Sequence, residues 1–502
     1  MTKTNAPLTW AEKIRAIWTR PSTPFWAGLT LILIFFVATT LPIVGEKPLE
    51  YDEGWNLQAP FQLSQTGTYG SFGSIFEGKD ETFDPYLSTG PVVSLPIAIG
   101  FRLFDVGIVQ ARVVMMLFFM FTMTMMAYYV YRQTRNLFAL AAPLLALLLV
   151  ANPPIDLRVD VLGEITAVGF GLASIVGWQK NRYGLAGILA AIAIHAKLVM
   201  AFLLPAGCAL LLIKLLVWKN KKAALLASLR WCVGAVLPLL IWEIIKFIQL
   251  GSVAAYRHNW SEFVRIFKVG GSGFAENGTI LSMRDKADMV TSTLGMPSLL
   301  FGALVAVLVI LVIMQRKQSW PRIKENSLGL VFIAIYLGWW LFQANGGYLR
   351  YVVPVMGVGI AIALAISLPR NTDKDRSKAF TVFAAGALLV VIVGVIKSYP
   401  YHKPDYSALA LKDQQYVVDK LKAEPPQALT HLGWWQNPEI MLMGNMRTTG
   451  EHLRPAGQEY DLLLSPIMRR NVPADYAKGL DKCLDIKFEH AGYIYCRAYK
   501  AE

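Results

Sequence analysis

Long apolar stretches, separated by short polar segments, occupy most of the chain between residues 25 and 398. One crossing of a bilayer needs about 20 consecutive apolar residues, and the first stretch, residues 25–44, has that length. The pattern predicts about eleven membrane-spanning helices. They are residues 25–44, 108–131, 137–150, 161–178, 183–194, 199–218, 227–247, 290–314, 328–342, 352–368 and 380–396. The expected fold is therefore mainly α and polytopic.

The loops between alternate spans carry most of the basic residues, and such loops lie on the cytoplasmic side of a membrane. Residues 1–24 share this side and combine aromatic with basic residues, which predicts an interfacial helical arm. An odd number of spans then places residues 399–502 outside. We expect an integral protein of a bacterial-type cell membrane, with a cytoplasmic N-terminus and an extracytoplasmic C-terminal domain.

Residues 46–107 form a large segment between the first two spans, and the topology places it outside as the first extracytoplasmic loop. Its apolar run 92–104 is short for a span and contains Pro96 and Arg102. Pro91 suits the first turn of a helix. We therefore expect an interfacial helix here, within a transmembrane domain of residues 25–398.

The composition changes from residue 399, where charged residues and proline become frequent. Residues 411–421 have helical spacing, whereas 460–464 and 493–499 have the pattern of strands. We predict a small α/β domain over residues 399–502. Cys483 and Cys496 would face each other if a hairpin turned at residues 489–490, but a turn at 491–492 would separate them by about 13 Å, too far for a disulfide. The sequence leaves both registers open.

The overall composition agrees with a membrane protein: 55% of the 502 residues are hydrophobic and 16% are charged, against roughly a quarter charged in soluble domains. The net charge of +14 comes largely from the short basic loops, so it reflects topology and does not indicate a nucleic-acid partner. No nucleotide-binding glycine motif and no zinc-type ligand spacing is present.

Clusters of ionisable residues all fall on the outer side of the predicted topology, which suggests a site there because such groups are costly near a bilayer. The first is the adjacent pair Asp52 and Glu53, directly behind the first span. The others are Asp80, Glu81 and Asp84; Arg158, Asp160 and Glu164; His195 and Lys197; and Tyr348, Arg350 and Tyr351. For Arg158, Asp160 and Glu164, at the loop between the third and fourth predicted spans, a purely structural ion pairing that closes the helix ends explains the charges equally well.

The order of several motifs resembles that of the GT-C glycosyltransferases, most closely the protein O-mannosyltransferase and aminoarabinose transferase type. The similarity is strongest over residues 25–200. The motifs are Asp52-Glu53 behind the first span, Ser88-Thr89-Gly90-Pro91 and Phe101-Arg102-Leu103-Phe104 at the ends of the interfacial helix, Ala111-Arg112 at the second span, and the later Tyr348-Leu349-Arg350-Tyr351 with Pro354.

The resemblance implies inverting transfer of a sugar from a polyprenyl-phosphate carrier to a glycan, lipid or protein acceptor on the outer face. Asp52 would be the general base towards the acceptor hydroxyl, with Glu53 assisting or orienting it. Cations would stabilise the departing phosphate, and the candidates are Arg158, Lys197 and Arg350. The candidate substrate-binding residues are Tyr51, Asp84, Thr89, Asp160, Glu164, Tyr348 and Tyr351.

The chain also departs from its nearest types. Thr89-Gly90-Pro91 stands where aminoarabinose transferases carry Lys-Pro-Pro, and the His-Pro-Pro of the O-mannosyltransferases is absent. Only the broader class is therefore expected, with the sugar and acceptor left open. No metal ligands are assigned, although Asp52, Glu53 and Asp84 leave a divalent cation open. The alternatives are a polysaccharide ligase or polymerase that uses lipid-diphosphate glycans, and a lipid or anion transporter (flippase).

Overall fold

A computed structural model describes most of the chain. The described residues are 22–71, 80–152, 155–217, 219–270, 281–286, 288, 316–344, 349–368, 409–426, 429–432 and 437–500. The predicted N-terminal arm and the predicted spans 290–314 and 380–396 lie outside these ranges.

Four segments in the described part of the chain are helical, apolar and long enough to cross a membrane. They are α2 (Thr23–Glu46), α5 (Ile108–Thr134), η2 with α9 (Leu198–Phe202 and Leu203–Val217) and α10 (Lys221–Leu250). Large apolar side chains such as Leu31, Leu216 and Ile248 remain more than 60% exposed, as expected for surfaces that face lipid. The prediction of an integral, mainly helical membrane protein is confirmed.

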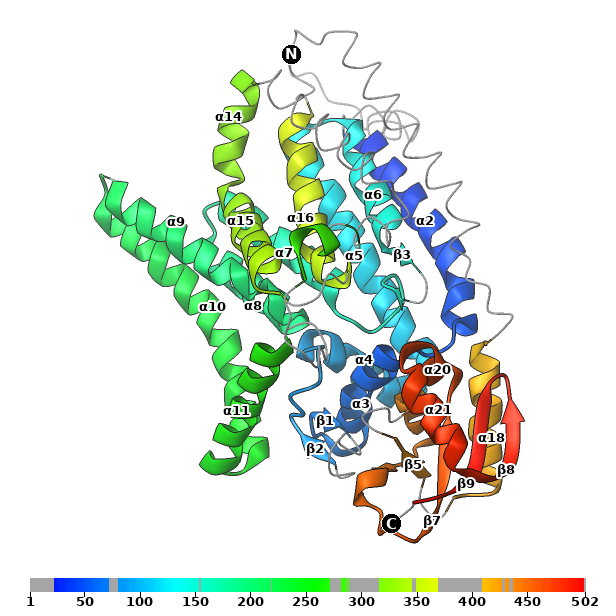
Figure 1. Cartoon of the computed structure of the whole chain (residues 1–502). Helices are drawn as coiled ribbons and strands as arrows, with labels where there is room; N and C mark the ends of the chain where they lie inside the picture. Colours follow the sequence, from blue (N-terminus) through cyan, green and yellow to red (C-terminus); the bar gives the residue numbers. More distant parts are fainter. Residues whose placement is uncertain are drawn as a thin grey trace, which may run out of the picture.

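Shorter helices pack between and beside these four (Figure 1). They are η1 (Leu137–Leu140), α6 (Ala141–Val150), α7 (Glu164–Gln179), α8 (Tyr183–Ala196), α11 (Val253–Gly270), α14 (Arg316–Glu325), α15 (Ser327–Phe342) and α16 (Leu349–Ser367). Several coincide with predicted spans, although they have 10 to 19 residues. The total of eleven spans stays a prediction.

The segment that follows α2 in the chain is largely helical. It contains α3 (Tyr51–Thr66), the two-residue strands β1 (Gly70–Ser71) and β2 (Glu81–Thr82), and α4 (Pro91–Phe104). The structure confirms the expected helix at α4, where Gly90 precedes Pro91 at the first helical position. The structure also contains α3, which the apolar pattern did not indicate. This helix is rich in polar residues, yet it is buried on most of its faces.

The C-terminal region contains a five-stranded mixed sheet with helices packed on it, as expected for a mixture of helices and strands. The strand order is β6-β5-β7-β9-β8, with β5 parallel to β6 and β7, and β9 antiparallel to β7 and β8. The strands are β5 (Leu429–His431), β6 (Thr448–Gly450), β7 (Glu459–Leu464), β8 (Cys483–His490) and β9 (Tyr493–Tyr499); the helices are α18 (Leu411–Ala423), α19 (Pro438–Gly444), η3 (Glu451–Leu453), α20 (Pro466–Asn471) and α21 (Pro473–Lys482).

Cys483 and Cys496 form a disulfide with Cα atoms 5.7 Å apart, although the hairpin turns at Ala491 and Gly492. A regular ladder from that turn would keep the cysteines apart. Two register shifts in β8 bring Cys483 opposite Ala498, two residues from Cys496 on the same strand. Irregularities in the strand therefore decide the pairing that the sequence left open.

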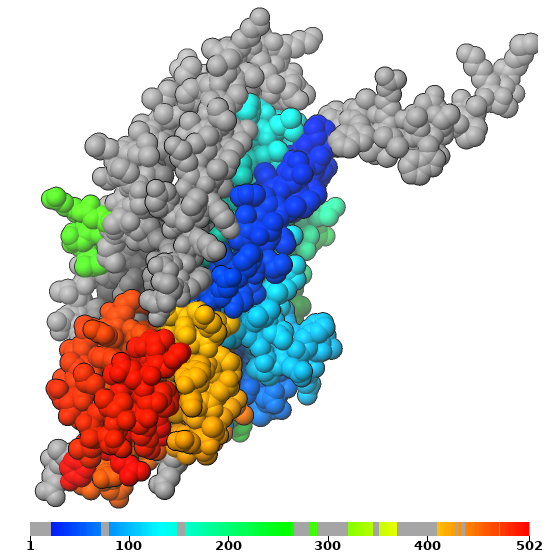
Figure 2. All heavy atoms as spheres, turned by 90° about the vertical axis from the view of Figure 1, so that its right-hand side faces the viewer, coloured from blue at the N-terminus to red at the C-terminus, as the bar shows by residue number. Residues whose placement is uncertain are grey.

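The C-terminal region lies beside α3 (Figure 1) and below the C-terminal end of α2 (Figures 1 and 2). Contacts between α3 and α19 join the two regions. The division of the chain at residue 399 stays a prediction, but the sheet region lies directly against the segment that carries the acidic pair.

Candidate functional site

Asp52 and Glu53 lie in the first turn of α3. Glu50 precedes the helix with extended backbone, and carboxylates in a first turn are favoured by the helix dipole. The backbone carbonyl of Asp52 accepts a hydrogen bond from the Asn56 side chain at 2.8 Å. The Asp52 side chain is partly exposed, whereas Glu53 is buried. The two adjacent carboxylates therefore have different environments.

Glu53 is held by Arg112 at the start of α5. The guanidinium donates from Nε to Glu53 Oε1 at 2.9 Å and from Nη2 to Oε2 at 2.7 Å. Its remaining hydrogens reach the carbonyl oxygens of Val44, Lys47 and Pro48. Arg112 thus fastens the end of α2 and the start of α3 to α5, and both oxygens of Glu53 are engaged.

A second buried ion pair joins Lys47 to Asp160. Burial raises the pKa of Asp160 to about 7, although Lys47 opposes the shift. Burial alone would lower the pKa of Lys47, but the carboxylates of Asp160 and Glu53 outweigh it and raise that pKa. Asp160 also accepts a hydrogen bond from the backbone N–H of Asp156 at 2.7 Å. Asp160 therefore acts in the structure as the link between the α6–α7 loop and the end of α2.

Arg158, a phosphate candidate, pairs within its own loop. Its Nε lies 2.8 Å from Asp156 Oδ1, and its Nη2 lies 2.5 Å from Asp156 Oδ2. Both side chains are buried. Burial opposes ionisation of Asp156, but Arg158 outweighs it and lowers the pKa of that carboxyl. Asp156 thus engages two of the three guanidinium nitrogens of Arg158, so a phosphate bound by Arg158 would share it with this carboxylate.

Lys197, another phosphate candidate, lies directly after α8. Its Nζ is 2.9 Å from Glu164 Oε1, 3.2 Å from Ser88 Oγ and 3.1 Å from the carbonyl oxygen of Leu162. Glu164 is fully buried at the start of α7, and its Oε2 has no hydrogen-bond partner in the described part of the chain. The Glu164 carboxylate is therefore under-satisfied and leaves hydrogen-bonding capacity beside the lysine.

Two glycines allow the backbones around Lys197 to approach one another. A Cβ on Gly90 would lie 1.9 Å from the carbonyl oxygen of His195, and one on Gly163 would lie 2.3 Å from that of Ala196. Gly163 also has φ +79°, in the left-handed region. Any larger residue at these positions would push the lysine away from the Ser88–Gly90 segment.

Hydrogen bonds connect the acidic motif to Lys197. Asn56 on α3 donates to the carbonyl of Asp52 and accepts, through Oδ1, from both the backbone N–H and the hydroxyl of Ser88. Ser88 Oγ in turn accepts from Lys197. A chain of polar contacts therefore runs from the turn that carries the candidate base to the candidate phosphate ligand.

Tyr51 and Asp84 lie in the same neighbourhood. The pKa of Tyr51 lies well above its usual value. Burial of the Tyr51 hydroxyl is the largest cause, and the nearby carboxylates of Asp52, Glu439 and Asp84 add to it. Asp84 accepts from Ser71 Oγ at 2.5 Å and from the backbone of Tyr86 at 2.8 Å. Burial raises the pKa of Asp84 to about 6, against these two hydrogen bonds.

The remaining candidates are placed less directly. Thr89 is buried, and its hydroxyl lies 3.4 Å from the carbonyl oxygen of Val161. Tyr351 is partly exposed, and its backbone carbonyl accepts from the hydroxyl of Tyr336. Arg350 belongs to α16, but the structure does not describe its side chain, and Tyr348 lies outside the described residues.

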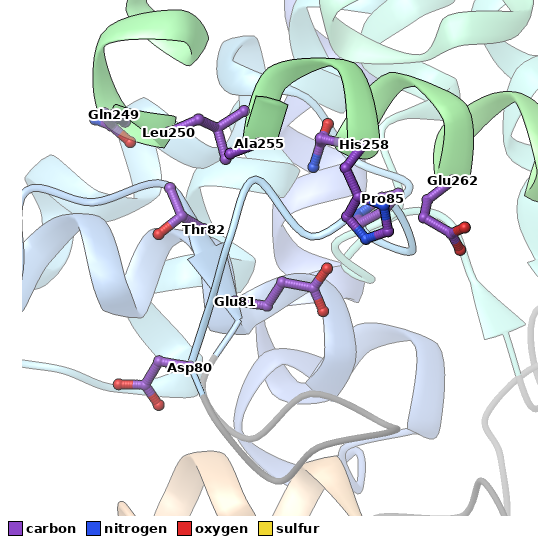
Figure 3. A pocket seen from close by; sticks show the side chains of 10 residues that line it. Asp80, Glu81, Thr82, Pro85, Gln249, Leu250, Ala255, His258 and Glu262 are labelled. Atoms are coloured by element: carbon purple, nitrogen blue, oxygen red, sulfur yellow. The ribbon is translucent and has the colours of Figure 1, made fainter. Parts of the chain in front are cut away.

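Asp80 and Glu81 line a pocket of about 300 Å³ between β2 and α11 (Figure 3). The Glu81 carboxylate points towards the side formed by His258 and Glu262, whereas Asp80 points away and pairs with Arg447 at 2.7 Å. As far as the described residues form them, the walls of this pocket include neither Asp52 nor Lys197. This competing acidic dipeptide is thus separate from the chain of contacts to the lysine.

The described ranges contain no group of three or more His, Cys, Asp or Glu side chains placed to hold a metal ion. Sequence reasoning missed the side chains that bind the predicted ones: Lys47, Asn56, Ser88, Arg112 and Asp156. Arg112 and Ser88 belonged to motifs noted in the sequence. No role was expected from the sequence for the other three, Lys47, Asn56 and Asp156.

The fold and the site define a helical membrane protein with a densely ion-paired segment at one end of its spanning helices. No protein-family model and no curated protein sequence matches the chain. Among solved structures, it is similar to ArnT from Cupriavidus metallidurans bound to undecaprenyl phosphate. The TM-score is 0.59 at 12% identity, over 95% of this chain and 98% of that one. The apo state of the same protein gives a TM-score of 0.57 at 12% identity, over 93% and 97%.

A further match is the oligosaccharyltransferase AglB from Archaeoglobus fulgidus, in complex with an inhibitory peptide and a dolichol-phosphate. Its TM-score is 0.50 at 13% identity, over 88% of this chain and 65% of that one. Both matched proteins are GT-C glycosyltransferases. The chain therefore has the GT-C fold, as the resemblance in the sequence led us to expect.

Proposed function

We propose that this protein is an integral membrane glycosyltransferase that transfers a sugar from a polyprenyl-phosphate donor to an acceptor on the extracytoplasmic face. The observation that carries the proposal is the GT-C fold over more than nine-tenths of the chain, with Asp52 on the helix directly behind the first spanning helix. One matched structure holds undecaprenyl phosphate, and this supports a donor of that class.

Asp52 is the proposed general base. Its carboxylate takes the proton of an acceptor hydroxyl as that oxygen attacks the anomeric carbon. The bond from the anomeric carbon to the phosphate oxygen breaks, and its electron pair leaves with the phosphate. A single displacement of this kind inverts the configuration. Asp52 suits the role better than Glu53 because it is partly exposed, whereas both Glu53 oxygens are bound by Arg112. Glu53 then orients the motif.

Lys197 is the proposed ligand of the departing phosphate. It is a cation connected to the Asp52 turn through Ser88 and Asn56, and positive charge at the leaving oxygen stabilises the transition state. Its ion pair with Glu164 keeps the ammonium group oriented. Arg158 and Arg350 are proposed as further phosphate ligands, with Arg158 shared between the phosphate and Asp156.

The remaining predicted residues are proposed to bind or orient substrate: Tyr51, Asp84, Thr89, Asp160, Glu164, Tyr348 and Tyr351. Tyr51 and Asp84 are the strongest of these because both lie near Asp52 or share its electrostatic environment. Asp160 would act indirectly, through Lys47. The acceptor is a glycan, lipid or protein that reaches the outer face.

The direct test is reconstitution of the purified protein in liposomes with polyprenyl-phosphate sugars and an acceptor extract. The proposal predicts acceptor-dependent release of polyprenyl phosphate. Turnover only with lipid-diphosphate glycans would favour a ligase or polymerase. Lipid translocation without any sugar release would favour a transporter and contradict the proposal.

A further inference from the structure

The C-terminal region is hydrogen-bonded to the backbone of the residues that precede the acidic motif. The N–H of Leu49 donates to Gln414 Oε1 at 2.7 Å, and Gln414 Nε2 donates to the carbonyl oxygen of Leu49 at 2.9 Å. Gln414 lies on α18 and is fully buried. One side-chain amide thus satisfies both polar groups of a residue that lies three positions before Asp52 and belongs to no helix or strand.

A second contact lies on the other side of Asp52. Helix α19 packs on α3 so closely that a Cβ on Gly54 would lie 2.8 Å from the backbone nitrogen of Glu439 and 3.0 Å from the carbonyl carbon of Pro438. These are backbone atoms, which cannot move aside as a flexible side chain would. Only glycine at position 54 allows this approach.

Hydrogen bonds join the two contacts. Gln414 Nε2 also lies 3.2 Å from the hydroxyl of Tyr493, which in turn lies 3.4 Å from Glu439 Oε1. Glu439 is fully buried, and its Oε2 has no hydrogen-bond partner in the described part of the chain. The grip on Leu49 and the contact with Gly54 therefore belong to one buried unit of the C-terminal region.

We propose that the C-terminal region positions the acidic motif for the transfer reaction: Gln414 and α19 hold the backbone at Leu49 and Gly54, on either side of Asp52. The inference rests on the proposed function. Gln414 and Gly54 are positioning residues, because they act on Asp52 through its backbone and touch no reacting atom. A misplacement of about 1 Å at a reacting group can cost about 100-fold in rate.

The sharpest test replaces Gly54 by alanine, with Gly45→Ala as the matched control. Both glycines are in helices, and alanine is the better helix former, so a loss of activity cannot come from helix propensity. A Cβ at Gly45 would meet no atom within 4 Å. We expect Gly54→Ala to lower kcat by about 10- to 100-fold, with the donor KM within about twofold of wild type, and Gly45→Ala to behave as wild type. Equal kcat in both variants would overturn the inference.

A second measurement does not depend on activity. In Gln414→Leu the backbone N–H of Leu49 loses its acceptor, so hydrogen–deuterium exchange in residues 47–50 should become at least about 10-fold faster. The control is Gln415→Leu, because Gln415 is exposed and contacts Asp419 instead. An unchanged rate of hydrogen–deuterium exchange in Gln414→Leu would show that Gln414 does not hold the backbone of Leu49. If Gln414→Leu does not fold, Gly54→Ala decides.

The two proposals fail in different ways. If the wild type transfers no sugar, the proposed function fails, and the exchange measurement still tests whether Gln414 holds Leu49. If the wild type transfers sugar and Gly54→Ala is fully active, the positioning role alone is wrong.

Discussion

Arg112 binds both oxygens of Glu53, at 2.9 and 2.7 Å, in a pair that is almost completely buried. The guanidinium also donates to the backbone carbonyl oxygens of Val44, Lys47 and Pro48, at the end of α2 and directly after it. Glu53 therefore fixes the segment, whereas Asp52, which is partly exposed, is the residue proposed to act on the substrate.

Arg112→Met should destabilise the protein strongly. Removing one partner of a buried ion pair leaves the other charge uncompensated, at a cost of about 3–5 kcal/mol. The unfolding temperature in detergent should fall by several degrees, whereas Arg182→Met, at an exposed arginine, should leave it unchanged. The double variant Arg112→Met with Glu53→Gln should recover part of the loss. An unfolding temperature equal to that of wild type in the single variant would contradict the structural role of the pair.

Lys197→Met should weaken binding of the donor. Loss of one charged hydrogen bond to a phosphate is worth about 1.5–3 kcal/mol, so the donor KM should rise about 10- to 100-fold. Lys180→Met is the control, since Lys180 is exposed and contacts Tyr128.

Glu164 would be left buried without its cation in that variant. Lys197→Met should therefore also be measured together with Glu164→Gln, which removes the unpaired charge. A donor KM that returns to the wild-type value in the double variant would mean that the lysine acts only by balancing Glu164.

Stability should fall as the pH rises from about 5 to 8. Burial raises the pKa of Glu439 from 4.5 to about 8. Between these values the folded state keeps a proton that the unfolded state releases, so the free energy of unfolding decreases by up to about 1.4 kcal/mol per pH unit. Asp84 and Asp160, with pKa values raised to about 6 and 7, act in the same direction over narrower ranges.

Glu439→Gln isolates this effect, because the amide is close in shape and does not titrate. Its unfolding temperature should depend less steeply on pH than that of wild type, with the largest gain near pH 8. Parallel pH profiles for the two proteins would show that Glu439 is not kept protonated in the fold.

The disulfide should stabilise the edge of the C-terminal sheet. Cys483 and Cys496 are 13 residues apart, and closing a loop of about 15 residues contributes about 3 kcal/mol. Reduction should accelerate proteolysis within β8 and β9. The variant Cys483→Ser with Cys496→Ser should be cleaved equally fast with and without reductant. An equal rate of cleavage of the wild type with and without reductant would show that the disulfide does not stabilise this edge of the sheet.

The sequence predicted the elements whose periodicity or length is distinctive. The first apolar helix, the helix that follows Gly90 and the strand 493–499 could be predicted because the local sequence pattern determines them. Helix α3 could not, since its burial comes from neighbours on several sides, and no apolar stripe marks it.

The partners of the charged residues were less predictable still. Lys47 lies 113 residues from Asp160, and Leu49 lies 365 from Gln414. Such contacts are set by how distant elements pack, which residue spacing along the chain does not encode. Ser88 and Arg112 could have been suspected, because both stand in the motifs that resemble the GT-C enzymes.

Asp52 is proposed above as the base of a sugar transfer. The most direct measurement compares single-turnover transfer from a polyprenyl-phosphate sugar by wild type, Asp52→Asn and Asp80→Asn, with donor binding measured in parallel. We expect the transfer rate to fall by about 10²- to 10⁴-fold in Asp52→Asn, with donor still bound, and to stay near the wild-type rate in Asp80→Asn. Undiminished transfer by Asp52→Asn would contradict the role of Asp52 as the base.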